Sequence, residues 1–295
     1  MQKKLAFFLV LVMTLALLAV GTADQAVPLT GVGNARELGG YSAADGRTVR
    51  HGVLLRTAKL SGATEEDLRI LAEDYHLAVV ADFRGDTEIE KAPDPEISGV
   101  RNLNLPIIDD SAELPEEMKA EMEELAALNG EITKMDRLRL ALKYGTFSDQ
   151  MYVDFLSMDR GKEGYSRLFR ELLALDDGRA ILFHCSEGKD RTGCAAMLIL
   201  YALGADEETV MEDFRLTNEF NADLIETDRQ LLRDEGIPEE EMDSYLPMLD
   251  QVNPAYMTNA IAWMTENYGS PLGYITRELG VTEAEIDELR NKFLE

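Results

Sequence analysis

Short apolar runs alternate with longer amphipathic segments along this chain. A short, mainly apolar run is typical of a strand that is covered on both faces. We predict strands at residues 53–55, 78–81, 103–108 and 181–183. The segments between them repeat apolar residues at helical spacing, most clearly at Tyr165, Leu168, Phe169, Leu172 and Leu173. Strands that alternate with helices predict an α/β fold with a mostly parallel central sheet flanked by helices.

Two further segments are predicted to be helical. Residues 111–159 are acidic, with breaks at Gly130 and Gly145, and we interpret them as a layer that covers the core. Residues 221–249 carry charges together with apolar residues at helical spacing, and a Gly-Ile-Pro stretch divides them into two helices with a turn. Judged from these residues alone, we interpret the second segment as a helical hairpin that is fixed in position.

The first residues have the pattern of a secretory signal peptide. Lys3 and Lys4 precede an apolar run at 5–20, and small residues follow at 21–23. The run is slightly short for a spanning helix, although an uncleaved N-terminal anchor is an alternative. We therefore expect residues 1–23 to be removed.

The mature protein is expected to be exported, either secreted or held in the periplasm or cell envelope. We expect a single domain at 24–295, with no stable membrane insertion after cleavage of the leader. The pattern favours no particular oligomeric state.

Charge and cysteine content exclude several classes of protein. The formal net charge is −27, from 29 basic and 56 acidic side chains. This charge argues against nucleic acid or an anionic membrane surface as a partner, and solubility is its simplest interpretation. Only Cys185 and Cys194 are present, so a disulfide scaffold is excluded.

The chain is organised around residues 181–193, where an apolar strand, a polar loop and a helix follow one another. This order aims several backbone N–H groups and the positive end of a helix dipole at one point, which forms an anion site. Cys185 and Arg191 enclose five residues, so sulfur and guanidinium can face the same tetrahedral oxyanion. A helix N-terminus favours the nucleophilic thiolate, and guanidinium binds phosphate oxygens in pairs.

The other loop residues are expected to contact the same anion. Thr192 could donate a hydrogen bond to the sulfur, Lys189 adds positive charge, and the glycines permit close approach of the backbone. The expected contact residues in and beside the loop are His184, Ser186, Glu187, Gly188, Lys189, Thr192 and Gly193. We expect no metal, because the sequence has only three histidines and two cysteines. For His184 we favour a role in orienting Cys185, and direct acid catalysis is the alternative.

Polar residues at two other places are candidates for the site. Asp82 and Arg84 follow the strand predicted at 78–81, and ligands of α/β sheets lie beyond the carboxyl ends of strands. The alternative for this pair is a structural ion pair. Arg36 lies in a glycine-rich stretch, where local packing and substrate binding are equally good interpretations.

The loop sequence HCSEGKDRTG resembles the signature of cysteine-dependent phosphatases, and specifically of bacterial tyrosine phosphatases, some of which act on phosphoinositides. The resemblance runs from about Asn34 to the C-terminus and includes NARELGGY, VLLRTAKL, ADFRGDTE and RLTNEF. It implies a cysteine-phosphatase fold, no cofactor, and a phosphorylated protein or phosphoinositide as substrate. It also implies that the helical pair at 221–250 is a lid over the site.

The resemblance implies a phosphocysteine intermediate on Cys185, stabilised by Arg191 and hydrolysed by water. Asp190 is the first candidate for the general acid, because members of the resembled family use an aspartate at this place. Burial would favour its protonated form, whereas Lys189 would oppose it. Asp82 is the second candidate and Asp109 the third.

Three alternative functions are open at this point. The chain could be a phosphoinositide or inositol-polyphosphate phosphatase, whose pocket would need more than two basic side chains. It could bind phosphate without turnover. It could also be a thiol redox enzyme that pairs Cys185 with Cys194, although we interpret Cys194 as a small core residue.

Overall fold

The computed structural model describes residues 25–109 and 114–295, so the predicted leader lies outside the described residues. A five-stranded sheet has the order β1-β2-β5-β3-β4, and every neighbouring pair is parallel except β1 with β2. The strands are β1 (Arg36–Glu37), β2 (Leu54–Thr57), β3 (Leu77–Asp82), β4 (Arg101–Asn104) and β5 (Ala180–His184). The prediction of an α/β fold with a mostly parallel sheet is confirmed.

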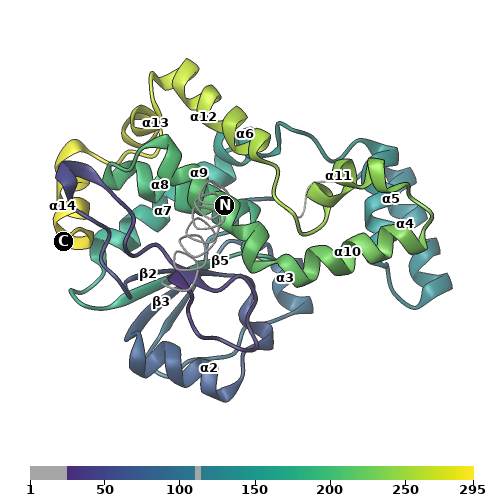
Figure 1. The fold of residues 1–295 in the computed structure, drawn as a ribbon, viewed down its shortest axis with the longest axis horizontal. Helices are drawn as coiled ribbons and strands as arrows, with labels where there is room; N and C mark the ends of the chain where they lie inside the picture. Colours follow the sequence, from purple (N-terminus) through teal and green to yellow (C-terminus); the bar gives the residue numbers. More distant parts are fainter. Residues whose placement is uncertain (1–24, 110–113) are drawn as a thin grey trace, which may run out of the picture.

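Helices cover both faces of the sheet (Figure 1). The smaller apolar cluster lies between the sheet and the segment α2 (Glu65–Arg69) with η3 (Ile70–Asp74). The larger cluster contains residues of α6 (Met151–Ser157), α7 (Asp159–Ala174), α8 (Asp190–Leu203), α9 (Glu207–Phe220), α12 (Pro254–Tyr268), α13 (Pro271–Arg277) and α14 (Glu283–Phe293). Because both faces are covered, β5 is buried along its whole length, as its apolar pattern predicts.

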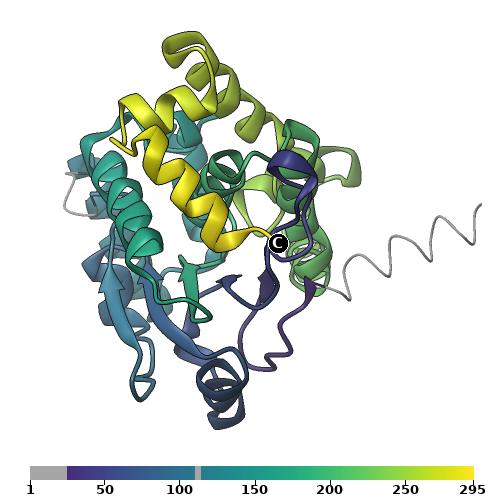
Figure 2. The same cartoon turned by 90° about the vertical axis from the view of Figure 1, so that its left-hand side faces the viewer.

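Helix α8 is the centre of the larger cluster. It is apolar almost all round and packs against β5, β2, α13 and α14. Figure 2 shows α14 crossing in front of this layer, next to α7. A helix buried on all sides has little freedom to shift, so the loop that enters it is held firmly.

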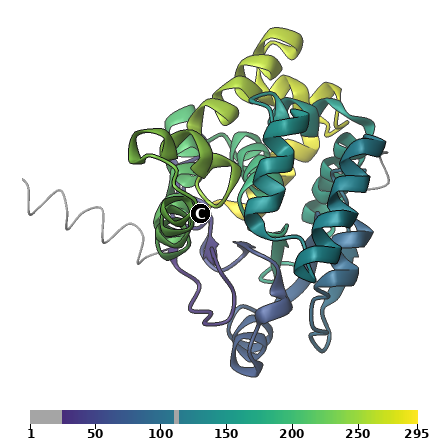
Figure 3. The same cartoon turned by 90° about the vertical axis from the view of Figure 1, so that its right-hand side faces the viewer.

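A third apolar cluster lies away from the sheet. It joins α5 (Lys134–Tyr144), α10 (Ala222–Asp234), α11 (Glu239–Tyr245) and η4 (Leu246–Met248), which we call the helical cap. Figure 1 shows these helices to the right of the sheet together with α4 (Glu116–Asn129), and Figure 3 views them from that side. Lys134 joins the cap internally, because its ammonium contacts Asp228 and lies 2.6 Å from Asp250 Oδ2.

Most predicted helix boundaries are confirmed. Gly130 and Gly145 end α4 and α5 in the left-handed conformation, with φ of 81° and 63°. The predicted hairpin at 221–249 is present as α10 and α11. Among the described residues, no helix is long and apolar enough to cross a membrane.

The strand predicted at 103–108 is wrong in its position. β4 covers Arg101–Asn104 and lies at the edge of the sheet with exposed polar side chains. The apolar pattern belongs instead to buried Leu105 and Ile107, which continue past the strand into the larger core. Pro106 between them has no N–H to donate to a ladder, so the regular strand ends first.

A buried ionic cluster joins the start of the sheet to α9. The Asp213 carboxylate lies between the guanidinium groups of Arg36 and Arg56, and both arginines have 0% exposure. Arg36 also donates to the carbonyl of Asp213 and to the hydroxyl of Thr217. Burial and the charge of Arg56 lower the pKa of Arg36 to about 10, although Asp213 acts in the opposite direction. For Arg36, the structure therefore favours packing over substrate binding.

We expect Asp213→Asn to destabilise the protein by about 3–5 kcal/mol, because two buried guanidinium groups would lose the carboxylate that they share. Urea unfolding at neutral pH measures this change. Glu212→Gln, at the neighbouring exposed position on the same helix, is the control and should change stability by less than about 0.5 kcal/mol. Equal unfolding midpoints for the two variants would contradict the prediction.

Candidate active site

The loop between β5 and α8 has unpaired backbone donors. β5 ends at His184 and α8 begins at Asp190, as the strand–loop–helix pattern predicts. Within the described part of the chain, the amides of residues 186–191 donate to no protein acceptor. Gly188 allows this path, since its φ is +64° and a Cβ there would lie 2.4 Å from the carbonyl oxygen of Thr57. Such a row of free N–H groups at a helix N-terminus is an anion site.

The loop is held from below by side chains distant in the sequence. Asn34 Nδ2 donates to the carbonyls of Glu187 and Gly188, at 3.1 and 2.9 Å. Arg56, from the buried ionic cluster, donates to the same Gly188 carbonyl at 2.8 Å. The loop carbonyls thus point down into the protein, which leaves the amides directed at the ligand side.

Arg191 is close enough to Cys185 for the sulfur to raise its pKa, and it is fixed by a carboxylate that sequence analysis missed. Its Nη1 and Nη2 donate to the two oxygens of Glu88, at 2.5 and 2.9 Å, and Ser186 Oγ donates to the same carboxylate. Burial would raise the pKa of Glu88, but the hydrogen bond and charge of Arg191 lower it to about 2. Burial likewise opposes the charge of Arg191, whereas Glu88 and the Cys185 sulfur raise the pKa of the guanidinium further.

Glu88 lies on α3 (Asp86–Lys91), directly after β3. The stretch ADFRGDTE, which carries part of the resemblance, ends at this residue. Nothing in the local pattern separates Glu88 from the other acidic residues of the helix, so the sequence did not mark it as a candidate. Only the packing of β3 next to β5 brings it to Arg191.

Asp82 and Arg84 belong to an internal ion network, which is the structural alternative considered for them. Arg84 has 0% exposure and donates to both oxygens of Asp82, to the carbonyl of Ala92 and to Asp94. With these donors engaged, Arg84 has little left to offer a substrate. The structure does not bring this pair into the ring of free amides.

His184 connects the ion network to the loop. Its Nδ1 lies 3.0 Å from the carbonyl oxygen of Cys185, and its Nε2 lies 3.0 Å from Asp94 Oδ2. The ring therefore holds the backbone of Cys185 and not its sulfur. His184, Asp82 and Asp94 are close enough together to ligate a metal, but the Arg84 guanidinium already lies against both carboxylates and supplies the positive charge.

Asp190 is the candidate acid that lies in the loop with a defined orientation. Its Oδ1 accepts a hydrogen bond of 2.7 Å from the Tyr152 hydroxyl, and its Oδ2 lies 3.8 Å from Lys189 Nζ. Its side chain keeps 25% exposure. The second candidate, Asp82, is bound by Arg84, and the third, Asp109, is exposed at the end of a described segment.

Two predicted contacts of the loop differ in the structure. Lys189 is buried and donates to the carbonyls of Pro247, Leu249 and Gln251 at 3.2, 2.6 and 3.3 Å, so it holds the helical cap and does not face a second phosphate. The buried Thr192 hydroxyl makes no hydrogen bond among the described residues, to the Cys185 sulfur or to any other group. A polar group buried in this way next to the loop is available to a ligand or to a charged sulfur.

Cys194 has 0% exposure inside α8. Burial, followed by the charge of Asp190, raises the pKa of its thiol well above the usual value. A thiol in this state is inert, which agrees with the interpretation of Cys194 as a core residue.

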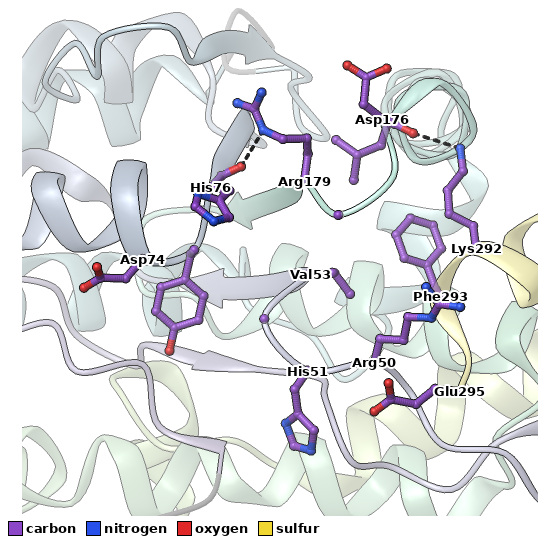
Figure 4. Close-up of a pocket in the computed structure, with 14 residues that line it drawn as sticks. Arg50, His51, Val53, Asp74, His76, Asp176, Arg179, Lys292, Phe293 and Glu295 are labelled. Atoms are coloured by element: carbon purple, nitrogen blue, oxygen red, sulfur yellow. Dashed lines mark hydrogen bonds between the residues drawn. The ribbon is translucent and has the colours of Figure 1, made fainter.

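A cavity of about 310 Å³ lies at the end of the parallel strands opposite to the loop (Figure 4). Val53, His76 and Arg179, which line it, immediately precede β2, β3 and β5. Arg179 donates to the carbonyl of His76 (Figure 4), and Arg50 and Lys292 also donate to backbone carbonyls. Because these cations already donate to backbone carbonyls, this cavity is not an anion site like the one formed by the loop amides.

Comparisons with known proteins agree with the chemistry of the loop. The model of the tyrosine phosphatase family matches residues 27–295. A "putative tyrosine-protein phosphatase" of Cupriavidus necator is 30% identical over 267 residues, which cover 89% of this chain and 86% of the relative. The triple specificity protein phosphatase PtpB of Mycobacterium tuberculosis is 31% identical over 134 residues, 43% of this chain and 48% of that protein. A tyrosine-protein phosphatase of Nostoc commune is 25% identical over 240 residues, covering 80% and 72% of the two chains.

We expect Glu88→Gln to weaken the binding of a tetrahedral oxyanion by about tenfold to a hundredfold, because Arg191 would lose the carboxylate that fixes its orientation. Titration calorimetry with tungstate measures this affinity. Glu90→Gln, at an exposed position on the same helix, is the control and should bind as the parent does.

The ion pair of Glu88 with Arg191 also predicts how the stability of the protein changes at low pH. The pKa of Glu88 is about 2 when folded and 4.5 in its unperturbed state, so its contribution to stability is present above pH 4.5. This contribution is lost as the pH falls toward about 2. The Glu88→Gln variant should therefore lose less stability over this interval than the parent, and parallel stability curves would contradict the assignment.

Proposed function

The chain belongs to the tyrosine phosphatase family, and from this membership we propose that it hydrolyses phosphotyrosine through a phosphocysteine on Cys185. It is a phosphoric monoester hydrolase. The observation that carries the mechanism is the row of free amides at residues 186–191, which ends at the Arg191 side chain.

The first step transfers the phosphoryl group to sulfur. The Cys185 thiolate attacks phosphorus, a bond forms between sulfur and phosphorus, and the bond from phosphorus to the tyrosine oxygen breaks. Asp190 gives its proton to that oxygen. The loop amides and the positive charge of Arg191, with its Nε–H, stabilise the charge on the three equatorial oxygens, which is the largest electrostatic contribution.

The second step restores the enzyme. A water molecule attacks the phosphocysteine, and Asp190, now a carboxylate, accepts a proton from it. The bond between phosphorus and sulfur breaks, phosphate leaves, and the thiolate is regenerated. The buried Thr192 hydroxyl would then have a partner, because it can donate to the negative sulfur when that charge appears.

Phosphoinositides are less well supported as substrates. A headgroup with several phosphates needs several free cations, but Lys189 donates to carbonyls of the cap and Arg84 to the internal network. Among the described residues of the loop, Arg191 keeps its Nε–H for a substrate, since its Nη groups donate to Glu88, Phe83 and Ser186. A thiol redox function needs a resolving cysteine, and Cys194 is completely buried.

Tyr152 positions Asp190 in this mechanism. Burial, followed by the charge of Asp190, raises the pKa of the Tyr152 hydroxyl well above its usual value, so it stays a donor. Its hydrogen bond to Oδ1 leaves Oδ2 to carry the proton that reaches the leaving oxygen. Tyr152 is itself fixed by ring contacts with Phe155, Phe214 and Tyr256.

We also propose that the enzyme is exported, with residues 1–23 as a signal peptide. The support is the sequence pattern of that segment, which lies outside the described residues. Mass spectrometry of the mature N-terminus in a secreting host tests this proposal.

We expect Cys185→Ser to reduce turnover of a phosphotyrosine peptide by on the order of 10³-fold or more, because the serine hydroxyl is a far weaker nucleophile. Cys194→Ala is the control and should keep activity close to that of the parent. Loss of activity in Cys194→Ala alone would support the redox function. A panel of phosphoserine and phosphothreonine peptides, inositol phosphates and phosphoinositides, assayed in parallel, defines the substrate class.

We expect Tyr152→Phe to lower kcat by about tenfold for phenyl phosphate, whose leaving group needs a proton. The same variant should change kcat for 2,4-dinitrophenyl phosphate by less than about twofold, because that phenolate leaves without a proton. In a background of Asp190→Asn, the substitution of Tyr152 should have no further effect.

Tyr165→Phe is the matched control, because this equally buried tyrosine donates to the Arg191 carbonyl and not to a carboxylate. We expect its effect to be the same for both substrates. If Tyr152→Phe also lowers kcat equally for both, Tyr152 supports the loop as a whole and does not position the acid.

A further inference from the structure

A groove of about 440 Å³ lies between helices of the cap, next to the catalytic loop. Lys134, Arg137 and Leu138 of α5 line one wall, Leu224 of α10 and Met248 of η4 line the opposite wall, and Glu187 of the loop completes it. Glu187 stands two positions after Cys185, a distance of at most about 7 Å along an extended chain. The groove is therefore within reach of residues that flank a phosphotyrosine bound at the thiol.

The wall of the groove that contains Met248 is also joined to the loop by hydrogen bonds. Lys189 donates to the carbonyls of Pro247 and Leu249, on either side of Met248. The same loop thus holds the phosphate and one wall of the groove. A ligand that fills the groove contacts a surface whose position relative to the loop is fixed by the protein.

One cation in the groove has no partner among the described residues. Lys134 is engaged with Asp228 and Asp250, and Glu187 lies 3.5 Å from Lys59. Arg137 is exposed, and its side chain makes no hydrogen bond or ion pair among the described residues. Leu224 keeps 43% exposure beside it.

We propose that this groove binds the residues next to phosphotyrosine in a protein substrate, with Arg137 bound to an acidic side chain. Leu138 and Leu224 contact an apolar neighbour of that residue. This proposal rests on the proposed function, because it assigns the substrate class of the same site.

The charges in the groove favour a single carboxylate over a polyphosphate. Asp250 and Glu187 place two negative charges in its walls, and Lys134 is occupied by Asp228 and Asp250. A headgroup with several phosphates would be repelled by these carboxylates, and among the described residues of the groove Arg137 is the cation left to oppose this repulsion. A peptide with one acidic residue pairs with Arg137 and leaves the apolar wall for its neighbour.

The experiment compares Arg137→Ala with the parent on three substrates. These are a phosphotyrosine peptide with flanking glutamates, the same peptide with alanines in their place, and p-nitrophenyl phosphate. We expect Arg137→Ala to lower kcat/KM for the acidic peptide by about tenfold, as loss of a charge-assisted contact implies. The other two substrates should change by less than twofold, and the preference of the parent for the acidic peptide should weaken with added salt.

Two further variants make the test specific. Arg139→Ala is the matched control, because Arg139 is exposed on the same helix and is already paired with Glu235. It should leave all three substrates unchanged. Arg137→Glu should reverse the preference, so that a peptide with flanking lysines becomes better than the acidic one.

The outcomes that overturn the proposal are distinct from failure of the proposed function. Equal loss on p-nitrophenyl phosphate, equal loss on the alanine peptide, or no loss on the acidic peptide each overturns it. Failure of the parent to hydrolyse any phosphotyrosine substrate would instead reject the proposed function.

Discussion

The active site depends on backbone amides at residues 186–191 that have no acceptor within the described protein. An amide left unpaired away from water costs about 1–3 kcal/mol, so a loop of this kind does not hold its shape by itself. Asn34 and Arg56 bind its carbonyls from below, and Glu88 fixes Arg191 at its end. A tetrahedral oxyanion then supplies the missing acceptors. Bound phosphate thus provides the hydrogen-bond acceptors that the loop amides lack within the described protein.

The electrostatics of the site are local. Arg36 and Arg56 share the Asp213 carboxylate, and Glu88 faces Arg191. Each buried guanidinium thus has a carboxylate beside it, in a protein whose formal net charge is −27. Attraction for a phosphate monoester comes from oriented amides, the dipole of α8 and the Nε–H of Arg191, all of which act over a few ångströms. This arrangement favours one compact dianion over a ligand with many phosphates.

The part of this site that follows from the sequence is the part made by neighbouring residues. The strand, loop and helix at 181–203 could be predicted, because the apolar pattern and the spacing of Cys185 from Arg191 are local signals. The role of Glu88 could not, because sheet order brings it to Arg191 across 103 residues. The direction of Lys189 was predicted wrongly for the same reason, since its acceptors lie 58 to 62 residues away in the cap. For Asp82 and Arg84, the residue types indicated a polar role, either in the site or in an ion pair. The sequence could not show how many protein partners each would have, and those partners decide between the two roles.

The hydrogen bonds that Asn34 and Arg56 make to the loop also determine when this enzyme gains its activity during folding. Arg56 and Asn34 reach Gly188 across 132 and 154 residues, so the catalytic backbone takes its shape only after the two halves of the chain have docked. Contacts of such separation form late and slowly, because a long loop must close before they are made. Turnover therefore indicates that folding is complete. A nascent chain that still lacks either half has no activity. After dilution from denaturant, hydrolysis recovers with the last docking event and not with the earlier formation of helices.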